Sequence, residues 1–394
     1  MSIATFAAVL IICGIYVVCE LVGKASNYKI PILVLFMLVL LVFGGQLGLI
    51  PADIFDTAGF SGLVYSFGLP FVLAGFGSTM SIKSLAGEGK TVVIAVIAVV
   101  FIMILGVIAG VTFMGMRTGI YGAIEIAGGG PAGLIFLTAL QEQGDNQMIA
   151  LMLCLMNMQI LIGYPLCTFF MKKSMRLRIK EDRIPELPSS YGESVLKQDK
   201  QLIKVPAWMQ TIYYDFAMLA LACLIGKEIS ELTGIAQYVW YILIGFLFAE
   251  LGLIKHNVLA ENGTAGMFFS IMFVTVCAGF LGVKITDMGP VIVNLIIVFA
   301  FGILGCLLGA VVSSRIFKID LYEAMAIGLG CMVGYPPSQK ITVEAMQAFR
   351  QEVEISDDVA LRLHAYYEPK IIISGIVTIS MLTGILAGIV VSYI

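Results

Sequence analysis

Long apolar runs separated by short polar loops dominate the chain, and they predict an all-α polytopic membrane protein. About 20 apolar residues form a helix that crosses the roughly 30 Å hydrocarbon core of a bilayer. The runs are too long, and alternate too little between polar and apolar positions, for membrane β-strands. We expect about ten transmembrane helices, at residues 3–22, 30–50, 62–80, 91–115, 147–171, 208–226, 235–254, 264–283, 289–314 and 368–393.

Two glycine-rich tracts interrupt apolar segments at matching places in the two halves of the chain. The first runs from Gly128 to Gly133 and the second from Gly328 to Ser338. Glycine and proline interrupt helices, and irregular backbone at membrane depth is tolerated only where it is buried in protein or lines a cavity. A matched pair of such interruptions is typical of a transporter's binding site. We therefore predict re-entrant segments at about 117–142 and 320–350.

The longest polar stretch, residues 172–206, divides the chain into a first repeat (1–171) and a second repeat (207–394). Its many lysines and arginines place it in the cytoplasm. Five helices per repeat is an odd number, so the repeats have inverted topology and both termini are predicted to be external. The first re-entrant segment then enters from outside and the second from inside, and their tips meet near the midplane.

The tips are the leading candidates for ligand binding. Glycine allows a ligand to approach the backbone closely, the N-terminus of a half-helix attracts anions, and exposed carbonyls suit Na⁺. The alternative is close helix packing through small residues. The candidates at the tips are Gly128, Gly129, Gly130, Gly330, Gly334 and Ser338.

Several polar side chains also lie in or beside apolar segments, where they are costly and usually face the protein interior or a cavity. Interhelical hydrogen bonding is the alternative role for the amides. These residues are Glu125, Asn157, Gln159, Asn294 and Lys340. We predict a Na⁺ site near Gly129, Gly330 and Asn157, and a possible contact between Lys340 and an anionic substrate.

Composition narrows the function further, since 60% of the residues are hydrophobic and 12% are charged. The sequence contains no nucleophile–base pair and no phosphate-binding loop, so we expect neither an enzyme nor an ATP-driven pump. Eight cysteines without a C-x-x-C motif and only two histidines predict no resident metal or cofactor, and nothing indicates nucleic-acid binding. The first helix lacks a cleavage site and is expected to be retained.

At both tips the chain resembles the sodium/glutamate symporter family and, more distantly, the 2-hydroxycarboxylate transporters. The likeness rests on Gly128–Gly130 with Gly133, and on a second set comprising Tyr322-Glu323-Ala324, Gly330-Cys331, Gly334, Pro336 and Glu344–Ala348. The chain departs from the family at Gly130-Pro131 and at Tyr335–Lys340, where substrate should be recognised. The resemblance implies a homodimer in which a transport domain moves like an elevator against a scaffold.

These observations predict a secondary active transporter in the bilayer of a prokaryotic cytoplasmic membrane. It would import a small organic anion or amino acid, such as glutamate, with Na⁺ as the coupling ion. One alternative is an H⁺-coupled or exporting carrier in which Glu125 carries the proton. A passive channel is another alternative, and a structural or sensory subunit ranks last.

Overall fold

In a computed structural model the described residues are 3–25, 32–79, 87–187, 203–282, 284–334, 337–377 and 382–393, and these are helical or in turns, with no strand among them. The first half contains α1 (Ile3–Ala25), α2 (Ile32–Val39), η1 (Leu40–Gln46), α3 (Ile54–Thr57), α4 (Phe60–Leu63), η2 (Val64–Gly68), α5 (Leu69–Ser78), α7 (Gly89–Ala109), η3 (Gly110–Met114), α8 (Met116–Gly128), α9 (Gly130–Gln143) and α10 (Asn146–Lys180).

The second half contains η4 (Ala207–Met209), α11 (Ile212–Thr233), α12 (Gln237–Leu251), α13 (Val258–Glu261), α14 (Ala265–Val276), η5 (Cys277–Gly282), η6 (Ile285–Asp287), α15 (Met288–Phe317), α16 (Leu321–Val333), α17 (Pro337–Glu352), α18 (Asp357–Ile376) and α19 (Gly384–Tyr393). Among the described residues, six helical segments are long and apolar enough to cross a membrane. The chain is thus a helical, multi-pass membrane protein.

The predicted segments overlap helices, but several boundaries were wrong, and the two largest errors are at α10 and α18. We expected the fifth helix to end at residue 171, whereas α10 continues to Lys180. We expected the last helix to begin at residue 368, whereas α18 begins at Asp357, where the hydroxyl of Ser356 caps it by accepting a hydrogen bond from the Val359 amide. Both extensions are polar, so a search for apolar runs misses them. Most of the predicted linker lies outside the described residues.

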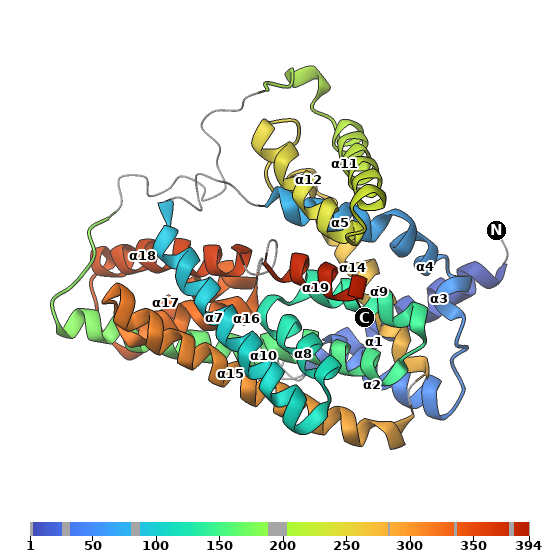
Figure 1. Cartoon of the computed structure of the whole chain (residues 1–394), viewed down its shortest axis with the longest axis horizontal. Helices are drawn as coiled ribbons and strands as arrows, with labels where there is room; N and C mark the ends of the chain where they lie inside the picture. The colour runs from blue at the N-terminus through green and yellow to red at the C-terminus, as the bar shows by residue number, and fades with distance from the viewer. Residues whose placement is uncertain are drawn as a thin grey trace.

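The helices form two groups (Figure 1). In the first, α7, α10, α15, α16, α17 and α18 lie together along the long axis of the molecule. In the second, α5, α11 and α12 pack on one another. We call the first group, with α8 and α9, the hairpin body. The second group, with α1 to α4 and α14, is called the outer body.

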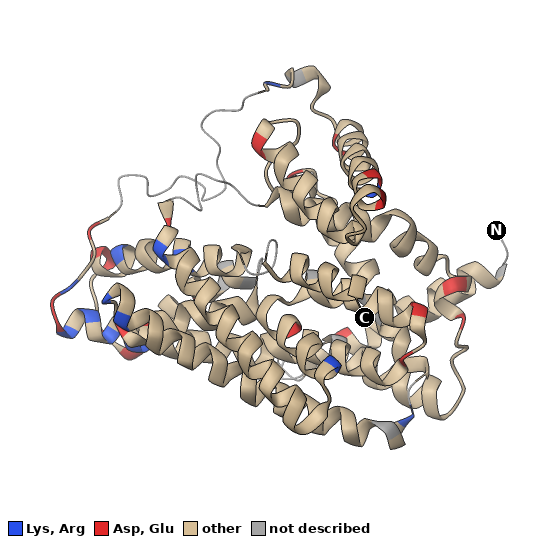
Figure 2. Ribbon diagram, in the orientation of Figure 1, with Lys and Arg blue, Asp and Glu red and all other residues tan. Residues whose placement is uncertain are grey.

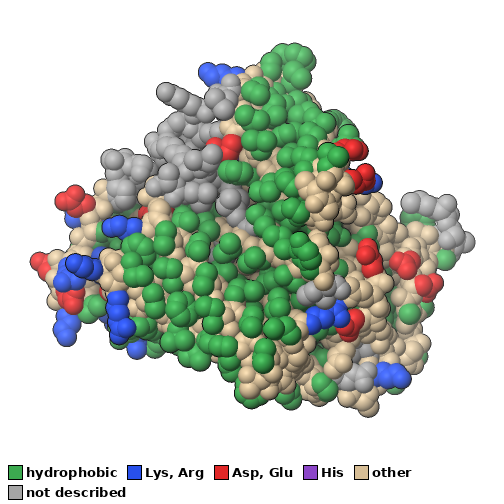
Figure 3. All heavy atoms as spheres, viewed as in Figure 1, with side chains coloured by type: hydrophobic (Ala, Val, Ile, Leu, Met, Phe, Trp, Pro, Cys, Tyr) green, Lys and Arg blue, Asp and Glu red, His purple; other side chains and the backbone are tan. Residues whose placement is uncertain are grey.

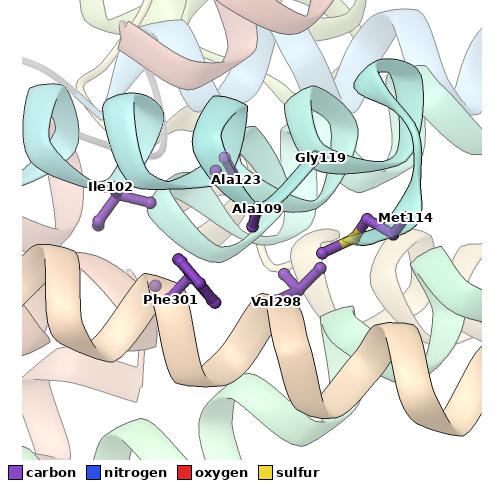
Figure 4. A pocket seen from close by; sticks show the side chains of 9 residues that line it. Ile102, Ala109, Met114, Gly119, Ala123, Val298 and Phe301 are labelled. Atoms are coloured by element: carbon purple, nitrogen blue, oxygen red, sulfur yellow. The ribbon is translucent and has the colours of Figure 1, made fainter. Parts of the chain in front are cut away.

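Glycines allow close helix packing within each body. Antiparallel α7 and α15 meet where a Cβ built on Gly305 would lie 2.7 Å from the Ile102 Cα. In the outer body, a Cβ on Gly77 of α5 would lie 2.0 Å from the Ile242 carbonyl oxygen of α12. Such small-residue contacts are typical of membrane helices. Where α7, α8 and α15 diverge, an apolar void of about 10 Å³ remains between Ala109 and Val298 (Figure 4).

Charged and apolar side chains divide the surface in the manner of a membrane protein. Lysines and arginines gather where α10 and α17 end, and a largely uncharged band lies beyond them (Figure 2). Hydrophobic side chains cover much of the face in view (Figure 3), and exposed apolar residues on the long helices include Leu10, Val111, Ile296 and Leu304. These helices are suited to face lipid.

Candidate functional site: two opposed helical hairpins

The first hairpin consists of α8 and α9, joined by a break at Gly129. This residue has φ 62° and ψ −142°, a conformation that is essentially restricted to glycine. The Gly129 amide donates to the Glu125 carbonyl (2.7 Å), and the Gly133 amide donates to the Gly129 carbonyl (3.2 Å). The rings of Tyr121 and Phe136 stack between the two arms, with centroids 4.1 Å apart. The helix is thus interrupted at Gly129.

The second hairpin consists of α16 and α17 and is broken at Gly334, with φ 71° and ψ 177°. The Gly334 amide donates to the Gly330 carbonyl (3.1 Å), and the Ser338 amide donates to the Gly334 carbonyl (3.0 Å). Residues 335–336 lie outside the described part of the chain. The same bonding pattern therefore sets Gly330 and Ser338 in the places that Glu125 and Gly133 occupy in the first hairpin.

Helix α10 places the two hairpins in opposite directions. At its N-terminal end, Arg117 of α8 pairs with Asp145, the N-cap of α10, at 3.3 Å. At its C-terminal end, Arg178 pairs with Glu323 of α16 at 2.5 Å. The base of one hairpin thus lies at one end of α10 and the base of the other hairpin at the other end. At 1.5 Å per residue, about 50 Å separates these ends.

Both tips reach the middle of α10. A Cβ on Gly129 would lie 2.8 Å from the Nε2 of Gln159, and a Cβ on Gly163 would lie 3.1 Å from a methyl group of Val333, the last residue of α16. Gln159 and Gly163 are four residues apart, so they share one face of the helix and are about 6 Å apart along it. The two tips therefore approach the same short segment of α10.

The C-terminal segment also passes both tips. A Cβ on Gly330 would lie 2.5 Å from the hydroxyl of Ser374 in α18, and a Cβ on Gly128 would lie 1.5 Å from the hydroxyl of Thr383, just before α19. Residues 378–381, between them, are outside the described part. Ser374 and Thr383 were not predicted as site residues, because a small polar residue within a membrane helix usually serves packing.

Several buried polar atoms without a hydrogen-bond partner among the described residues lie beside the tips. Both carboxyl oxygens of Glu125, the Oε1 of Gln159, and the hydroxyls of Ser338 and Thr342 are buried and have no partner among the described residues. Glu125, Ser338 and Thr342 are fully buried, and Gln159 is 2% exposed. Unsatisfied polar groups at this depth cost free energy, so their clustering favours a binding site over packing alone.

The remaining predicted site residues take other positions. Asn157 is partly exposed on α10, and its amide donates to the Leu153 carbonyl one turn earlier (2.8 Å). Asn294 is partly exposed on α15, beside the exposed Val293. Gly130 has open space where a Cβ would stand. The side chain of Lys340 lies outside what the structure describes.

A buried polar network holds the base of the second hairpin, and sequence analysis did not identify it. The hydroxyl of Tyr366 donates to the Oε1 of Glu323 (2.7 Å), while Arg178 binds the Oε2. The guanidinium of Arg178 also lies 4.2 Å from the centroid of the Tyr366 ring. Asp320 caps α16 by accepting hydrogen bonds from its first turn. We had assigned Arg178 to the linker because the apolar run ends before it.

Two adjacent cavities lie between the two bodies at the base of the first hairpin. They have volumes of about 290 and 370 Å³ and share Tyr65 and Gln141. Asp56 of the outer body lines one cavity and Glu142 of α9 lines the other, and no lysine or arginine lines either. Within the described residues, no three His, Cys, Asp or Glu side chains come together as they would to hold a metal.

Comparisons with known proteins find a likeness among solved structures. No protein-family model matches the chain, and no curated protein matches it. A solved structure of the sodium proton antiporter MjNhaP1 from Methanocaldococcus jannaschii is 18% identical, covering 95% of this chain and 96% of the antiporter chain, with a TM-score of 0.44.

The predicted resemblance to the sodium/glutamate symporter family is wrong, because no protein-family model, that family's included, matches the chain. The physical reason lies in the residues that carried the likeness. Gly129 and Gly334 adopt the positive φ that a break in a membrane helix requires, whatever the family of the protein. At Gly130-Pro131, where the side chains should be specific, the chain departs from that family.

Proposed function

We propose that this protein is a secondary active transporter that moves a small solute across the membrane by alternating access, using a cation gradient. The observation that carries the proposal is the meeting of two opposed, broken hairpins at one segment of α10, beside Gln159 and Gly163. Half-helices that meet at mid-membrane expose backbone groups able to bind an ion or a solute. A purely structural subunit would have no use for such breaks.

The arrangement of the two bodies supports movement of one against the other. The cavities that share Tyr65 and Gln141 lie at the junction of the bodies and open beside the first hairpin. Solute that enters there would meet α9 and travel along it toward the tip at Gly129. We propose that the hairpin body carries the site past the outer body, as in an elevator. The inverted repeats, the homodimer and the external termini stay predictions.

The lining of the cavities bears on what enters. Asp56 and Glu142 favour a cation or a neutral polar solute over an anion, since no basic side chain lines these cavities. The predicted anionic substrate thus gains no support from them. Na⁺ and H⁺ are the coupling ions that the buried Glu125 and the unpaired Gln159 oxygen suit. That the chain is not an enzyme and has no resident cofactor stays a prediction.

Ligand binding can be tested by thermal stabilisation of the purified protein. Small cations, polyols, amino acids and acids are screened with Na⁺ and with K⁺, at two pH values. A ligand that binds the folded protein raises the apparent stability by mass action. Stabilisation that depends on Na⁺ or on pH would identify both the solute class and the coupling ion.

Transport itself is tested in proteoliposomes with the solute so identified. Gly129→Val and Gly330→Val should abolish accumulation, because a side chain there meets Gln159 or Ser374. Gly14→Val is the matched control, since Gly14 on α1 has open space around it. Normal accumulation in both tip variants would refute the site. Flux in the wild type that never exceeds equilibration would indicate a channel and refute the proposal.

A further inference from the structure

The carboxyl group of Glu125 is enclosed between the two arms of the first hairpin. Glu125 lies one turn before the break at Gly129, and Gly133 lies one turn after it. A Cβ on Gly133 would lie 2.8 Å from each carboxyl oxygen, so a side chain at this position would force the carboxyl to shift. The side chain is fully buried, and neither oxygen has a hydrogen-bond partner among the described residues.

Among the described residues, no counter-charge contacts this carboxyl. The elements that pack most on α8 are α7, η3, α9, α10, α15, α16 and α19, and none of their described residues brings a charged side chain into contact with it. Arg117, on α8 itself, is engaged with Asp145 at the base. The polar groups nearest the tip are the Gln159 amide and the Thr383 hydroxyl, which approach Gly129 and Gly128.

A carboxyl in these surroundings is stable only when it is neutral. An ionised carboxylate that is buried without a partner loses its hydration and gains nothing in return. A bound cation would need several oxygen ligands around it, and the carboxyl oxygens face the backbone of Gly133 instead. The carboxyl therefore carries its proton when the hairpin is closed as described.

We propose that Glu125 is an exchangeable proton-carrying site whose proton is released when the first hairpin opens about Gly129. This inference rests on the proposed transport function and assigns it a coupling ion. On release, the O–H bond of the carboxyl breaks, the proton passes to water that has entered between the arms, and a carboxylate remains. The carboxylate then needs water or a cation, so it favours the open hairpin, and protonation favours the closed one.

The second hairpin has no ionisable side chain at the positions that correspond to Glu125 and Gly133. Its corresponding positions are Gly330 and Ser338, which carry no ionisable group. Proton dependence should therefore be confined to the first hairpin, which gives the test an internal reference.

Infrared spectroscopy of the purified full-length protein tests the protonation. At neutral pH the wild type should show a C=O band of a carboxylic acid that is free of hydrogen bonds, and Glu125→Gln should lack it. Glu142→Gln is the matched control on the same hairpin, because Glu142 is exposed at a cavity, and it should keep the band. Loss of a carboxylate band in Glu125→Gln, with no loss of an acid band, would show an ionised Glu125 and overturn the proposal.

Hydrogen–deuterium exchange tests the link to opening, with each variant compared with wild type at the same pH. At alkaline pH, the backbone amides of residues 121–135 should exchange at least about threefold faster in wild type than in Glu125→Gln. At acid pH the two proteins should exchange these amides at the same rate. Peptides covering 325–333 should show no such difference. Equal exchange rates for wild type and Glu125→Gln in the first hairpin at every pH would overturn the link between deprotonation and hairpin opening. Glu125→Asp, which keeps the ionisable group, should retain the pH dependence.

These readouts separate this inference from the proposed function, since neither requires transport. If the protein shows the carboxylic-acid band of Glu125 and pH-dependent hydrogen–deuterium exchange but accumulates no solute, the transport proposal is refuted and the proton site is supported. Accumulation that responds to a pH gradient identically in wild type and Glu125→Gln would keep transport and overturn the proton site.

Discussion

The two hairpins have the same broken backbone but differ at both ends. At the tips, the first places a carboxyl before the break and a glycine after it (Glu125 and Gly133), while the second places a glycine before it and a hydroxyl after it (Gly330 and Ser338). At the bases, the first is held by the half-exposed pair of Arg117 and Asp145. The second is held by the buried network around Glu323.

This difference suggests a division of tasks. A buried ion pair with further hydrogen bonds is costly to break, whereas a half-exposed pair contributes little. The second hairpin is therefore held more firmly at its base than the first. The hairpin with the weaker base is also the one that encloses an ionisable group.

The largest expected effect comes from breaking the bases. Arg178→Ala leaves Glu323, which is 2% exposed, without its counter-charge, and should destabilise the protein by about 3–5 kcal/mol. Arg117→Ala, at the other base, should cost about 0–1 kcal/mol. Unfolding of both variants in detergent measures the difference. Equal losses would contradict the contrast between the bases, and Arg178→Lys should recover part of the stability.

Substitutions of the tip glycines should have the next largest effect on stability. Alanine at Gly129 or Gly334 must adopt a backbone conformation that disfavours a side chain, at a cost of about 2–3 kcal/mol each. Gly129→Ala should be the more harmful because its methyl group also meets Gln159. Thermal unfolding of the two variants, with Gly14→Ala as the control, checks the order. A tolerated Gly129→Ala would mean that the break at the first tip is not needed.

Alanine substitutions one turn after each break should change stability in opposite directions. Gly133→Ala forces a methyl group against the Glu125 oxygens and should cost about 1–2 kcal/mol. Ser338→Ala removes a buried hydroxyl that has no partner, so it should be neutral or slightly stabilising. The measurement is the free energy of unfolding of each variant. A destabilising Ser338→Ala would show that this hydroxyl binds something in the folded protein.

The smallest effect is expected at the C-terminal end of α17. Lys172 donates a hydrogen bond to Glu352 (2.5 Å), and this bond holds the pKa of the Glu352 carboxyl below its usual range. A carboxyl whose pKa is lower in the folded than in the unfolded protein stabilises the folded protein at pH values above the unfolded pKa. This stabilisation is lost as the pH falls through the folded pKa. Lys172→Met should therefore lower the melting temperature slightly at pH 7, and the difference should disappear once the pH has fallen through the lowered pKa of the Glu352 carboxyl in the folded protein.

Lys180→Met, exposed at the end of the same helix, is the control for this last prediction. A difference between Lys172→Met and wild type that persists at low pH would show that Lys172 stabilises by packing and not through the carboxylate.

The sequence by itself determined the membrane class, the approximate positions of the helices and the two breaks. Apolar length dictates what can cross a bilayer, and glycine at Gly129 and Gly334 dictates where a helix can turn through positive φ. These properties are local, so they can be predicted without the fold. Family identity was not determined, because the same local requirement recurs in unrelated transporters.

Only the tertiary structure decided which polar groups meet. Gln159 reaches Gly129, Thr383 reaches Gly128, and Arg178 reaches Glu323 because distant segments pack together. The enclosure of Glu125 by Gly133 depends on how the two arms of one hairpin close. Sequence spacing sets positions along a helix, but side-chain burial and pairing depend on neighbours from other helices. That is the physical reason why the hairpins were predictable and the chemistry between them was not.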